Sequence, residues 1–535
     1  MSRRFGPRGG RGRLSSSVAT GYVAPTTPVS AKAGVFYWGA DLSDPATWAP
    51  RVDNVGAGSL TGVATTIENT TQGAYPSMRM VPANSAYLRN DYFAAQLIAA
   101  NPVFEIVMWI ETIVLGASCT FFSASTSSGT TFKRVLAYTT GAYRFTQQAT
   151  LAGPFVHNAK NTNLQMVRIR GRADGSITLW RNEEPDPING FWGNGTAATA
   201  IGAQTGMDRF LIGAQWNGGS GPVNFNDQRV VGFLWRNPAA AEYTDDEGIQ
   251  IHNWGLGALA NPPLYNDAVT QYALLMPFGQ SNEPGQGLGT GAVAGMPDAT
   301  AKMFIRALNN DADDPTAISA LDRRPGASSY SSSMQWIPTG SFAMQHHFCG
   351  VGMGATNIGS NWEGQNGAGP VNSLGGYMVT GLYSECRRNI MLSKARFGGN
   401  PIVQIIWQQG ENDAAAGAAV AAAYASNFAN PVSYTNVLGY LRKIIARVWG
   451  LADVPCHAVQ LNPNQTGGGI VTVDLNTIRA GMVTLAGTVT ALRLVETNDI
   501  TNLSVDNLHY KNASDSYGLI GTRLITSVKA SDARL

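Results

Sequence analysis

The first half of the chain alternates apolar and polar residues in short runs that Gly, Asn and Thr interrupt. Successive side chains of a β-strand point to opposite faces of a sheet, so a period of two predicts strands with one buried face. No run of helical period separates these strands, and many short strands in succession indicate an all-β sandwich. The predicted strands cover residues 86–89, 104–110, 131–138, 165–170, 176–180, 210–213 and 229–235.

One turn and one short helix refine the prediction for this half. Asp174-Gly175 joins two of the predicted strands, and this pair tolerates the positive φ angle that a tight hairpin turn needs. A closing helix is expected at residues 244–252. With its RADGSITLWRN hairpin and the later LIGA strand, the region 34–254 resembles a laminin-G or concanavalin-like jelly roll.

The second half of the chain has a different pattern. Residues 255–263, with the sequence GLGALANPP, interrupt the β pattern and are expected to form a linker. Beyond them, apolar runs alternate with longer helical segments, which predicts a parallel sheet with helices on both faces. The expected strands are 272–278, 342–351, 402–407, 456–461 and 491–495, and the expected helices are 374–396, 434–449, 475–486 and 514–528.

Size and charge limit the classes of protein that fit. A chain of 535 residues is long enough for two or three domains that each bury a core. Charged residues make up 13% of it, against about 25% in an average globular protein, which suggests a surface partly covered by partner subunits. The net charge of +2 provides no overall field that would favour nucleic acid or a membrane.

Residues 1–33 are a local exception, because they are rich in Gly, Ser, Pro and arginine and no acidic residue precedes Asp41. This composition is typical of a basic, flexible arm. We interpret the arm as an anchor to other proteins of an assembly, with contact to nucleic acid as the less favoured use. The arm lacks the apolar core of a signal peptide, and no stretch of about eighteen apolar residues occurs, so we expect neither a signal peptide nor a transmembrane segment. Its arginines are Arg3, Arg4, Arg8, Arg11 and Arg13.

Several classes of chemistry lack their motif in this sequence. There is no HExxH, no P-loop and no dinucleotide fingerprint in the proper context, so we expect no metal and no cofactor. There is also no Gly-x-Ser-x-Gly elbow, which argues against the α/β-hydrolase fold. The widely spaced cysteines form no CxxC pair, so buried thiols are expected rather than disulfides or a zinc site. They are Cys119, Cys349, Cys386 and Cys456.

Ser281 is the strongest candidate for a nucleophile. It lies in the turn Gly279-Gln280-Ser281-Asn282, directly after the predicted strand 272–278, and loops that leave such strand ends hold most α/β active sites. A serine in a turn can also be a simple capping residue. A nucleophilic serine needs a base that removes its proton and a third group that orients the base.

Asp506 and His509 can supply those two functions. They lie three residues apart just before the last predicted helix, so one turn of backbone can aim the carboxylate at one ring nitrogen and leave the other nitrogen for serine. Of the six histidines, only His509 has an acid at this spacing with a helix directly behind it. His346 and His347 lie in an apolar run, where we expect at least one of them to be a hydrogen-bonded core residue.

Four blocks in this order justify a comparison with a known family. Residues 272–528 resemble the SGNH/GDSL hydrolases, and specifically the sialate O-acetylesterase-like carbohydrate esterases. The second block departs from the Gly-Gly-Thr-x-Ile-x-x-Trp pattern, because alanine replaces one glycine and the tryptophan comes one position late. The blocks are Gly279-Gln280-Ser281-Asn282, Gly354-Ala355-Thr356-Asn357-Ile358-Gly359-Ser360-Asn361-Trp362, Trp407-Gln408-Gln409-Gly410-Glu411-Asn412-Asp413 and Asp506-Asn507-Leu508-His509.

The resemblance implies a flavodoxin-like, three-layer α/β domain at 264–535 and a role for each matching residue. Ser281 would be the nucleophile, His509 the general base and then acid, and Asp506 the residue that orients it. The departures in the second block leave the Ala355 amide as an alternative to that of Gly354. The implied oxyanion donors are the backbone N–H groups of Ser281 and Gly354 and the side chain of Asn412, and the implied supporting residues are Gln280, Gln409 and Glu411.

The resemblance further implies a metal-independent esterase that removes O-acetyl groups from a polysaccharide. Together with the arginine arm and the missing export signal, this chemistry suggests a bacteriophage virion component, such as a tail or head appendage acting outside the host cell. By analogy with such appendages we expect a homo-oligomer, with a trimer as the first guess. The jelly roll would bind glycan or pack against neighbouring proteins. The alternatives are a non-catalytic glycan-binding adhesin and a structural decoration protein with a vestigial esterase domain.

Overall fold

The computed structural model describes twenty segments of the chain. Their limits are residues 31–70, 75–114, 118–128, 133–139, 142–147, 150–155, 164–181, 184–185, 190–191, 203–255, 263–279, 287–288, 302–307, 319–320, 330–331, 336–338, 340–352, 381–428, 437–511 and 513–535. The basic arm up to residue 30 and most of the expected linker at 255–263 lie outside them.

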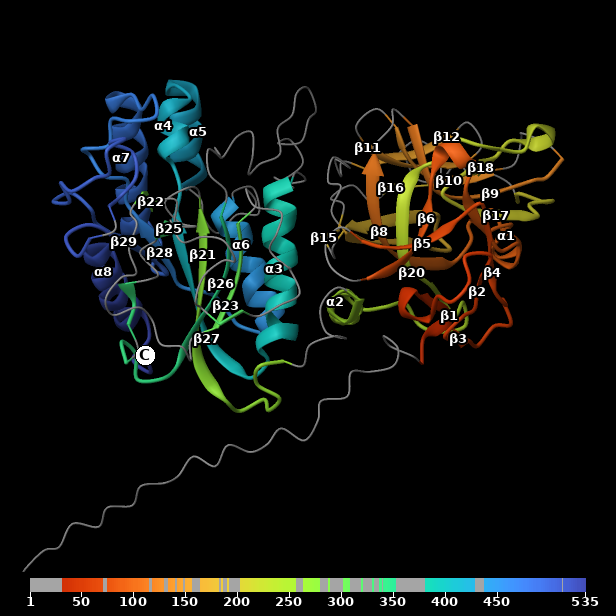
Figure 1. The fold of residues 1–535 in the computed structure, drawn as a ribbon, viewed down its shortest axis with the longest axis horizontal. Helices are drawn as coiled ribbons and strands as arrows, with labels where there is room; N and C mark the ends of the chain where they lie inside the picture. The colour runs from red at the N-terminus through yellow and green to blue at the C-terminus, as the bar shows by residue number, and fades with distance from the viewer. Residues whose placement is uncertain are drawn as a thin grey trace, which may run out of the picture.

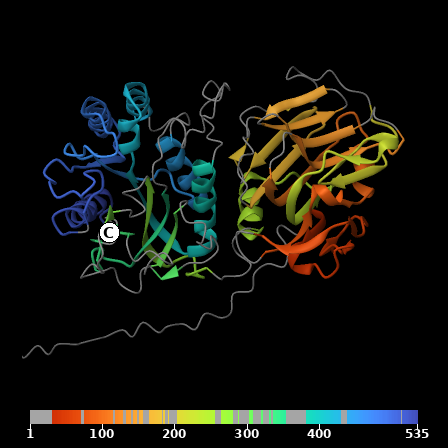
Figure 2. The same cartoon turned by 45° about the horizontal axis from the view of Figure 1, so that its top comes forward.

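Two antiparallel sheets form a jelly-roll-like sandwich in the N-terminal half of the described chain (Figure 1 and Figure 2), so the predicted all-β sandwich is confirmed. One sheet contains β1 (Ala33–Trp38), β3 (Val52–Asp53), β5 (Thr66–Asn69), β6 (Pro76–Met80), β8 (Phe104–Val114), β13 (Gln165–Gly171), β14 (Ser176–Arg181), β15 (Glu184–Pro185), β16 (Gly190–Phe191) and β20 (Asp227–Arg236). The other contains β2 (Thr47–Trp48), β4 (Leu60–Val63), β7 (Tyr87–Arg89), β9 (Ser118–Ser125), β10 (Lys133–Thr139), β11 (Ala142–Gln147), β12 (Thr150–Phe155) and β17 (Arg209–Ile212). Outside both sheets lie α1 (Tyr92–Gln96) and the hairpin of β18 (Gln215–Trp216) and β19 (Pro222–Val223).

The alternation along β8 explains how its sheet is buried on both faces. Ile106 and Met108 point into the core between the sheets, whereas Val107 and Trp109 belong to a second buried cluster on the outer face. That outer face is covered in part by α2 (Asp245–Asn253), whose N-cap residue Thr244 forms a capping box. The expected helix at 244–252 is therefore confirmed.

The hairpin between β13 and β14 is also confirmed. The N–H of Gly175 donates to the carbonyl of Arg172 at 2.9 Å, and the Asp174 side chain accepts from the N–H of Ser176 at 2.8 Å. Gly175 has a φ of +84°, which a residue with a side chain rarely adopts. Asp-Gly therefore forms this turn for the reason that the sequence indicates.

A predominantly parallel sheet forms the centre of the C-terminal half. In the described residues its order is β24-β23-β26-β21-β27-β28-β29, and every pair except β24–β23 is parallel. The strands are β21 (Gln271–Gly279), β23 (Lys302–Ala307), β24 (Ser319–Ala320), β26 (His346–Gly352), β27 (Asn400–Gln408), β28 (Cys456–Val459) and β29 (Leu492–Val495), and β22 (Gly287–Leu288) pairs with β25 (Tyr330–Ser331) separately. The carboxyl ends of the parallel strands therefore lie at one edge of the sheet.

Helices cover both faces of this sheet. On one face, Ile405 and Trp407 of β27 belong to the same buried cluster as residues of α3, α5, α6 and α7. On the other face, Ile406 lies in a cluster with Ile520 and Leu524 of α8. The helices are α3 (Gly381–Phe397), α4 (Glu411–Ala415), α5 (Ala418–Phe428), α6 (Val437–Trp449), α7 (Thr472–Thr488) and α8 (Tyr517–Ser531).

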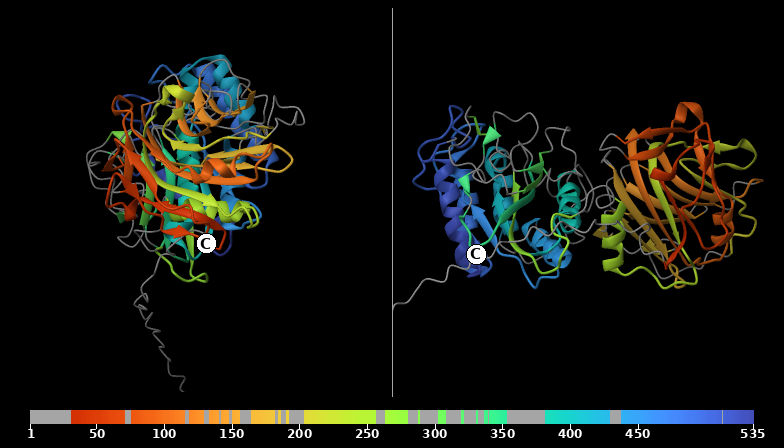
Figure 3. Two further views of the ribbon diagram at one scale, coloured as in Figure 1. Left: turned by 90° about the vertical axis from the view of Figure 1, so that its right-hand side faces the viewer. Right: turned by 60° about the horizontal axis from the view of Figure 1, so that its bottom comes forward.

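The helix α2 lies where the two halves meet (Figure 1 and Figure 3). It packs against α3, and its Asp245 carboxylate lies 3.2 Å from the guanidinium of Arg447 on α6. None of the helices in the described part of the chain is long and apolar enough to cross a membrane.

Candidate active site

The turn before α8 brings the Asp506 carboxylate and the His509 ring together. His509 Nδ1 lies 2.5 Å from Asp506 Oδ2, which fixes the orientation of the imidazole ring. Asp506 Oδ1 accepts three hydrogen bonds, from the backbone N–H groups of Leu508 and His509, each at 3.0 Å, and from the hydroxyl of Ser504. Partial burial alone would raise the pKa of Asp506, but the bonds from the Ser504 hydroxyl, the His509 ring and the two N–H groups hold it well below its usual range.

The loop after β28 holds this turn in place. The side-chain amide of Gln465, which is fully buried, donates to the carbonyl of Leu508 at 2.6 Å. The N–H of Gly467 donates to the carbonyl of Asn507, which has a left-handed φ of +52°. A Cβ on Gly467 would lie 1.8 Å from the carbonyl oxygen of Asp506, so only glycine fits at this position.

The chain that leaves β27 forms a second rigid part of the site. Gly410, with a φ of +132°, turns the chain into α4. The Gln409 amide donates to the Asp413 carboxylate at 3.0 Å, and the Tyr424 hydroxyl donates to the Gln409 carbonyl at 2.7 Å. Trp407 in turn donates from its indole N–H to Tyr424 at 3.0 Å. This network fixes the backbone that carries the residues after Gly410.

The two parts lie close to each other at the carboxyl edge of the sheet. Burial, reinforced by the nearby Glu411 carboxylate, raises the pKa of Tyr510 well above its ordinary value, and Tyr510 directly follows His509. The N–H of Val471, in the loop that also holds the Asp506 turn, donates to the Ala414 carbonyl of α4 at 3.2 Å. The structure thus brings Gln409, Glu411 and Asn412 to the same edge as Asp506 and His509.

Burial separates two groups among the residues after β27. Gln409 and Glu411 are buried, which suits a supporting role. Asn412 is partly exposed, as a side chain that reaches substrate must be.

The remaining expected site residues lie outside the described segments. The two strands that precede them in the chain, β21 and β26, are described. Gly279, the last residue of β21, pairs with Gln408 of β27 on one side and with Gly352 of β26 on the other. The described strands β21 and β26 therefore end, at Gly279 and Gly352, at the edge that carries the other candidates. The residues concerned are Gln280, Ser281 and Gly354, together with the alternative Ala355.

Two other described histidines, His347 and His457, have structural environments. His347 Nε2 lies 2.7 Å from the hydroxyl of Tyr265, which confirms that at least one histidine of the apolar run is a hydrogen-bonded core residue. His457 of β28 lies between Ser527 (2.7 Å) and Gln404 (2.9 Å), and burial lowers its pKa to about 3. Cys349, Cys386 and Cys456 are buried thiols.

Three contributors to the site were not expected from the sequence: Ser504, Gln465 and Tyr510. A serine two residues before an acid is too common to stand out, and the contact of Gln465 joins residues 43 positions apart. Tyr510 directly follows the candidate base His509. This adjacency was the one feature of the sequence that could have identified Tyr510 as part of the site.

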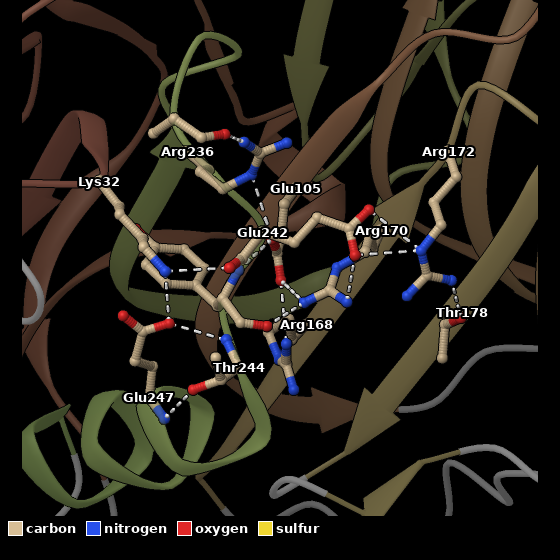
Figure 4. Close-up of polar contacts among 12 residues, drawn as sticks. Lys32, Glu105, Arg168, Arg170, Arg172, Thr178, Arg236, Glu242, Thr244 and Glu247 are labelled. Carbon is tan, nitrogen blue, oxygen red and sulfur yellow. Dashed lines mark hydrogen bonds and ion pairs between the residues drawn. The ribbon is translucent and has the colours of Figure 1, made fainter.

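A buried cluster of charged groups lies on the sandwich, away from this site (Figure 4). Glu105 Oε1 lies 2.9 Å from Arg168 and 2.8 Å from Arg170, and Glu105 Oε2 lies 3.2 Å from Arg236. The Arg168 guanidinium also stacks on the ring of Trp180 at 3.8 Å. Among the residues that the structure describes, no group of three His, Cys, Asp or Glu side chains is placed to hold a metal ion.

Comparisons with known proteins give no assignment for this chain. No protein-family profile matches it, and no curated protein matches it. Among solved structures it is similar to the Trypanosoma rangeli sialidase, with 14% identity and a TM-score of 0.30 over 44% of this chain and 35% of the sialidase. It is also similar to the binding domain of Paraclostridial Mosquitocidal Protein 1, with 11% identity and a TM-score of 0.31 over 44% of this chain and 57% of that domain. The chain spans about a third of the sialidase, and likenesses at these TM-scores carry no functional argument.

Proposed function

We propose that residues 264–535 form a serine esterase of the SGNH type that removes O-acetyl groups from a polysaccharide. The observation that carries the proposal is the Asp506–His509 pair at the sheet edge where β21 ends, two residues before Ser281. The strand order supports it, because β26-β21-β27-β28-β29, the part of the sheet without the edge strands β23 and β24, follows the 2-1-3-4-5 order of flavodoxin-like folds, in which ligands bind at the carboxyl ends near the first strand.

In the proposed reaction, His509 Nε2 takes the hydroxyl proton of Ser281 while Ser281 Oγ attacks the acetyl carbonyl. The N–H groups of Ser281 and Gly354 and the amide of Asn412 stabilise the resulting oxyanion. His509 then gives its proton to the departing sugar oxygen, so the sugar leaves with a free hydroxyl and the acetyl group stays on Ser281 Oγ as an acetyl-enzyme. Water, deprotonated by His509, attacks this ester, and acetate leaves as the proton returns to Ser281 Oγ. Asp506 stays ionised throughout because its pKa is so low, and it stabilises the imidazolium in both steps.

The proposal extends to the assembly. Residues 34–254 and the basic arm would mount the esterase on a bacteriophage particle as an oligomer, which we take to be a trimer, so that it acts on acetylated surface glycan of the host. The low charge content and the five arginines before Asp41 support this part. A monomer in solution that is also missing from purified particles would contradict it.

The test is hydrolysis of a chromogenic acetate ester, followed by acetate release from a panel of acetylated capsular polysaccharides. We expect turnover by the wild type and loss of turnover, with unchanged folding, in Ser281→Ala. Equal activity in both proteins would exclude Ser281 as the nucleophile. Glycan binding without turnover in either protein would favour the adhesin, and neither binding nor turnover would favour the decoration protein.

A further inference from the structure

We propose that Ser504 is a positioning residue for the acid–base pair, an inference that rests on the proposed esterase function. Its hydroxyl donates to Asp506 Oδ1, while Asp506 Oδ2 faces His509 Nδ1. The serine therefore acts on the base through the carboxylate and does not contact the reacting atoms.

The geometry assigns the two carboxylate oxygens different tasks. Oδ1 accepts from Ser504 and from the N–H groups of Leu508 and His509, and all three donors come from the same short turn. Three donors on one oxygen fix the plane of the carboxylate, so the other oxygen is aimed at the imidazole. Ser504 is the only side chain among these donors, and hence the only one that a substitution can remove.

The backbone around Ser504 is itself held firmly. Its N–H donates to the carbonyl of His509 at 2.8 Å, and its carbonyl accepts from the N–H of Asn507 at 3.0 Å. Leu503 and Tyr510 form a β-bridge directly outside this loop. Ser504 is buried, so its hydroxyl is screened from water and stays on the carboxylate.

Removal of the hydroxyl changes the charge that the base experiences. A carboxylate that loses a donor presents more negative charge to the imidazolium, which then keeps its proton to higher pH. Other charged groups of the packed elements, Glu411 of α4 and Arg479 of α7, act electrostatically on Tyr510 and are the same in both proteins.

The experiment compares Ser504→Ala with Ser504→Thr, which keeps a hydroxyl, and with Ser516→Ala. Ser516→Ala is the matched control, because it removes a buried hydroxyl from the same loop. The Ser516 hydroxyl accepts a hydrogen bond from the N–H of Lys511 and does not touch Asp506. For Ser504→Ala we expect kcat to fall about tenfold with KM unchanged, as the loss of one hydrogen bond to a charged group predicts. We also expect the acid limb of the pH profile of kcat/KM to shift to higher pH by about half a unit. Ser504→Thr should bring kcat and the acid limb back towards those of the wild type. Ser516→Ala should keep the acid limb of the wild type.

A second measurement separates this inference from the proposed function. In protein labelled with 15N-histidine, the His509 signals are assigned by their loss in His509→Gln, and their titration is followed by NMR. An upward shift of the pH at which the His509 signals titrate in Ser504→Ala supports the inference, even if no ester is hydrolysed. In that case only the esterase proposal fails. A titration or an acid limb that is unchanged in Ser504→Ala, or that moves equally in Ser516→Ala, overturns the positioning role.

Discussion

At the scale of single residues, the ionisation of Asp506 decides how the candidate site depends on pH. Its hydrogen bonds keep the carboxyl ionised far below neutral pH. Protonation of Asp506 therefore does not account for a loss of activity on mild acidification.

Asn412 offers the sharpest test of the oxyanion hole. If the proposed esterase reaction holds, we expect Asn412→Ala to lower kcat by about a hundred- to thousandfold, because removal of one oxyanion donor has this effect in acyl-transfer enzymes. The side chain is partly exposed on α4, so the fold should persist. Stopped-flow or steady-state turnover of an acetate ester checks this, with Asn502→Ala as the control, because the Asn502 amide bonds to Asp515 and not to the site. Turnover near that of the wild type would remove Asn412 from the mechanism.

The sequence allowed part of this site to be predicted at residue scale. The Asp506–His509 contact follows from a spacing of three residues, since one backbone turn decides it. The clamp from Gln465 and Gly467 could not be predicted, because it depends on how two loops far apart in the chain meet. Whether Ser281 reaches His509 stays a prediction, since that turn lies outside the described residues.

At the scale of elements, the apolar runs predicted most strands of the parallel sheet, and two deviations have physical reasons. The expected strand 342–351 begins instead at His346, because the N–H of Ala343 bonds to the carbonyl of the C-terminal Leu535 and not to a neighbouring strand. The strand β23 was not expected, since its short apolar run lies between Lys302 and Arg306 and carries little periodic signal. Residues 374–380 and 434–436 of two expected helices lie outside the described segments.

The packing of β28 against α8 makes stability depend on pH. His457 is neutral in the folded protein down to a pKa of about 3, whereas an unfolded histidine titrates near 6.5. The unfolded state thus binds an extra proton between these values, so the free energy of unfolding falls as pH falls from about 6.5 to about 3. The expected loss is about 5 kcal/mol in total.

Urea denaturation at several pH values measures this loss. We expect His457→Gln, which keeps a polar side chain without the titrating ring, to be less stable at neutral pH and to show a flatter decline towards acid. A decline equal to that of the wild type would assign the pH dependence to other groups.

At the scale of the whole molecule, a charged network ties one sheet of the sandwich to α2 (Figure 4). Glu105 holds the guanidiniums within the sheet, Glu242 links Arg170 to Arg172, and Lys32 bonds to Glu247 of α2 at 2.6 Å. The network therefore joins the start of the first strand, the sheet centre and the last helix of this half.

Glu105 is the residue on which that network depends. Glu105→Gln keeps the shape but leaves buried guanidiniums without their counter-charge, and removal of one partner of a buried ion pair typically costs about 3–5 kcal/mol. Differential scanning calorimetry should show a clearly lower unfolding temperature, with the proposed esterase activity unchanged below the transition. Glu68→Gln is the control, because Glu68 also binds an arginine but is 41% exposed, and it should cost less than about 1 kcal/mol. Equal effects of the two substitutions would contradict a central role for Glu105.

The position of α2 between the two halves affects where the chain can be truncated to express the C-terminal half alone. A fragment started at the linker would lose this helix, and the side of α3 that packs against it would face water. Apolar surface of α3 that the truncation exposes would favour self-association. A fragment that begins a few residues before Thr244 would keep α2 over this side of α3, so the shortest C-terminal fragment that stays monodisperse should retain the last helix of the preceding half.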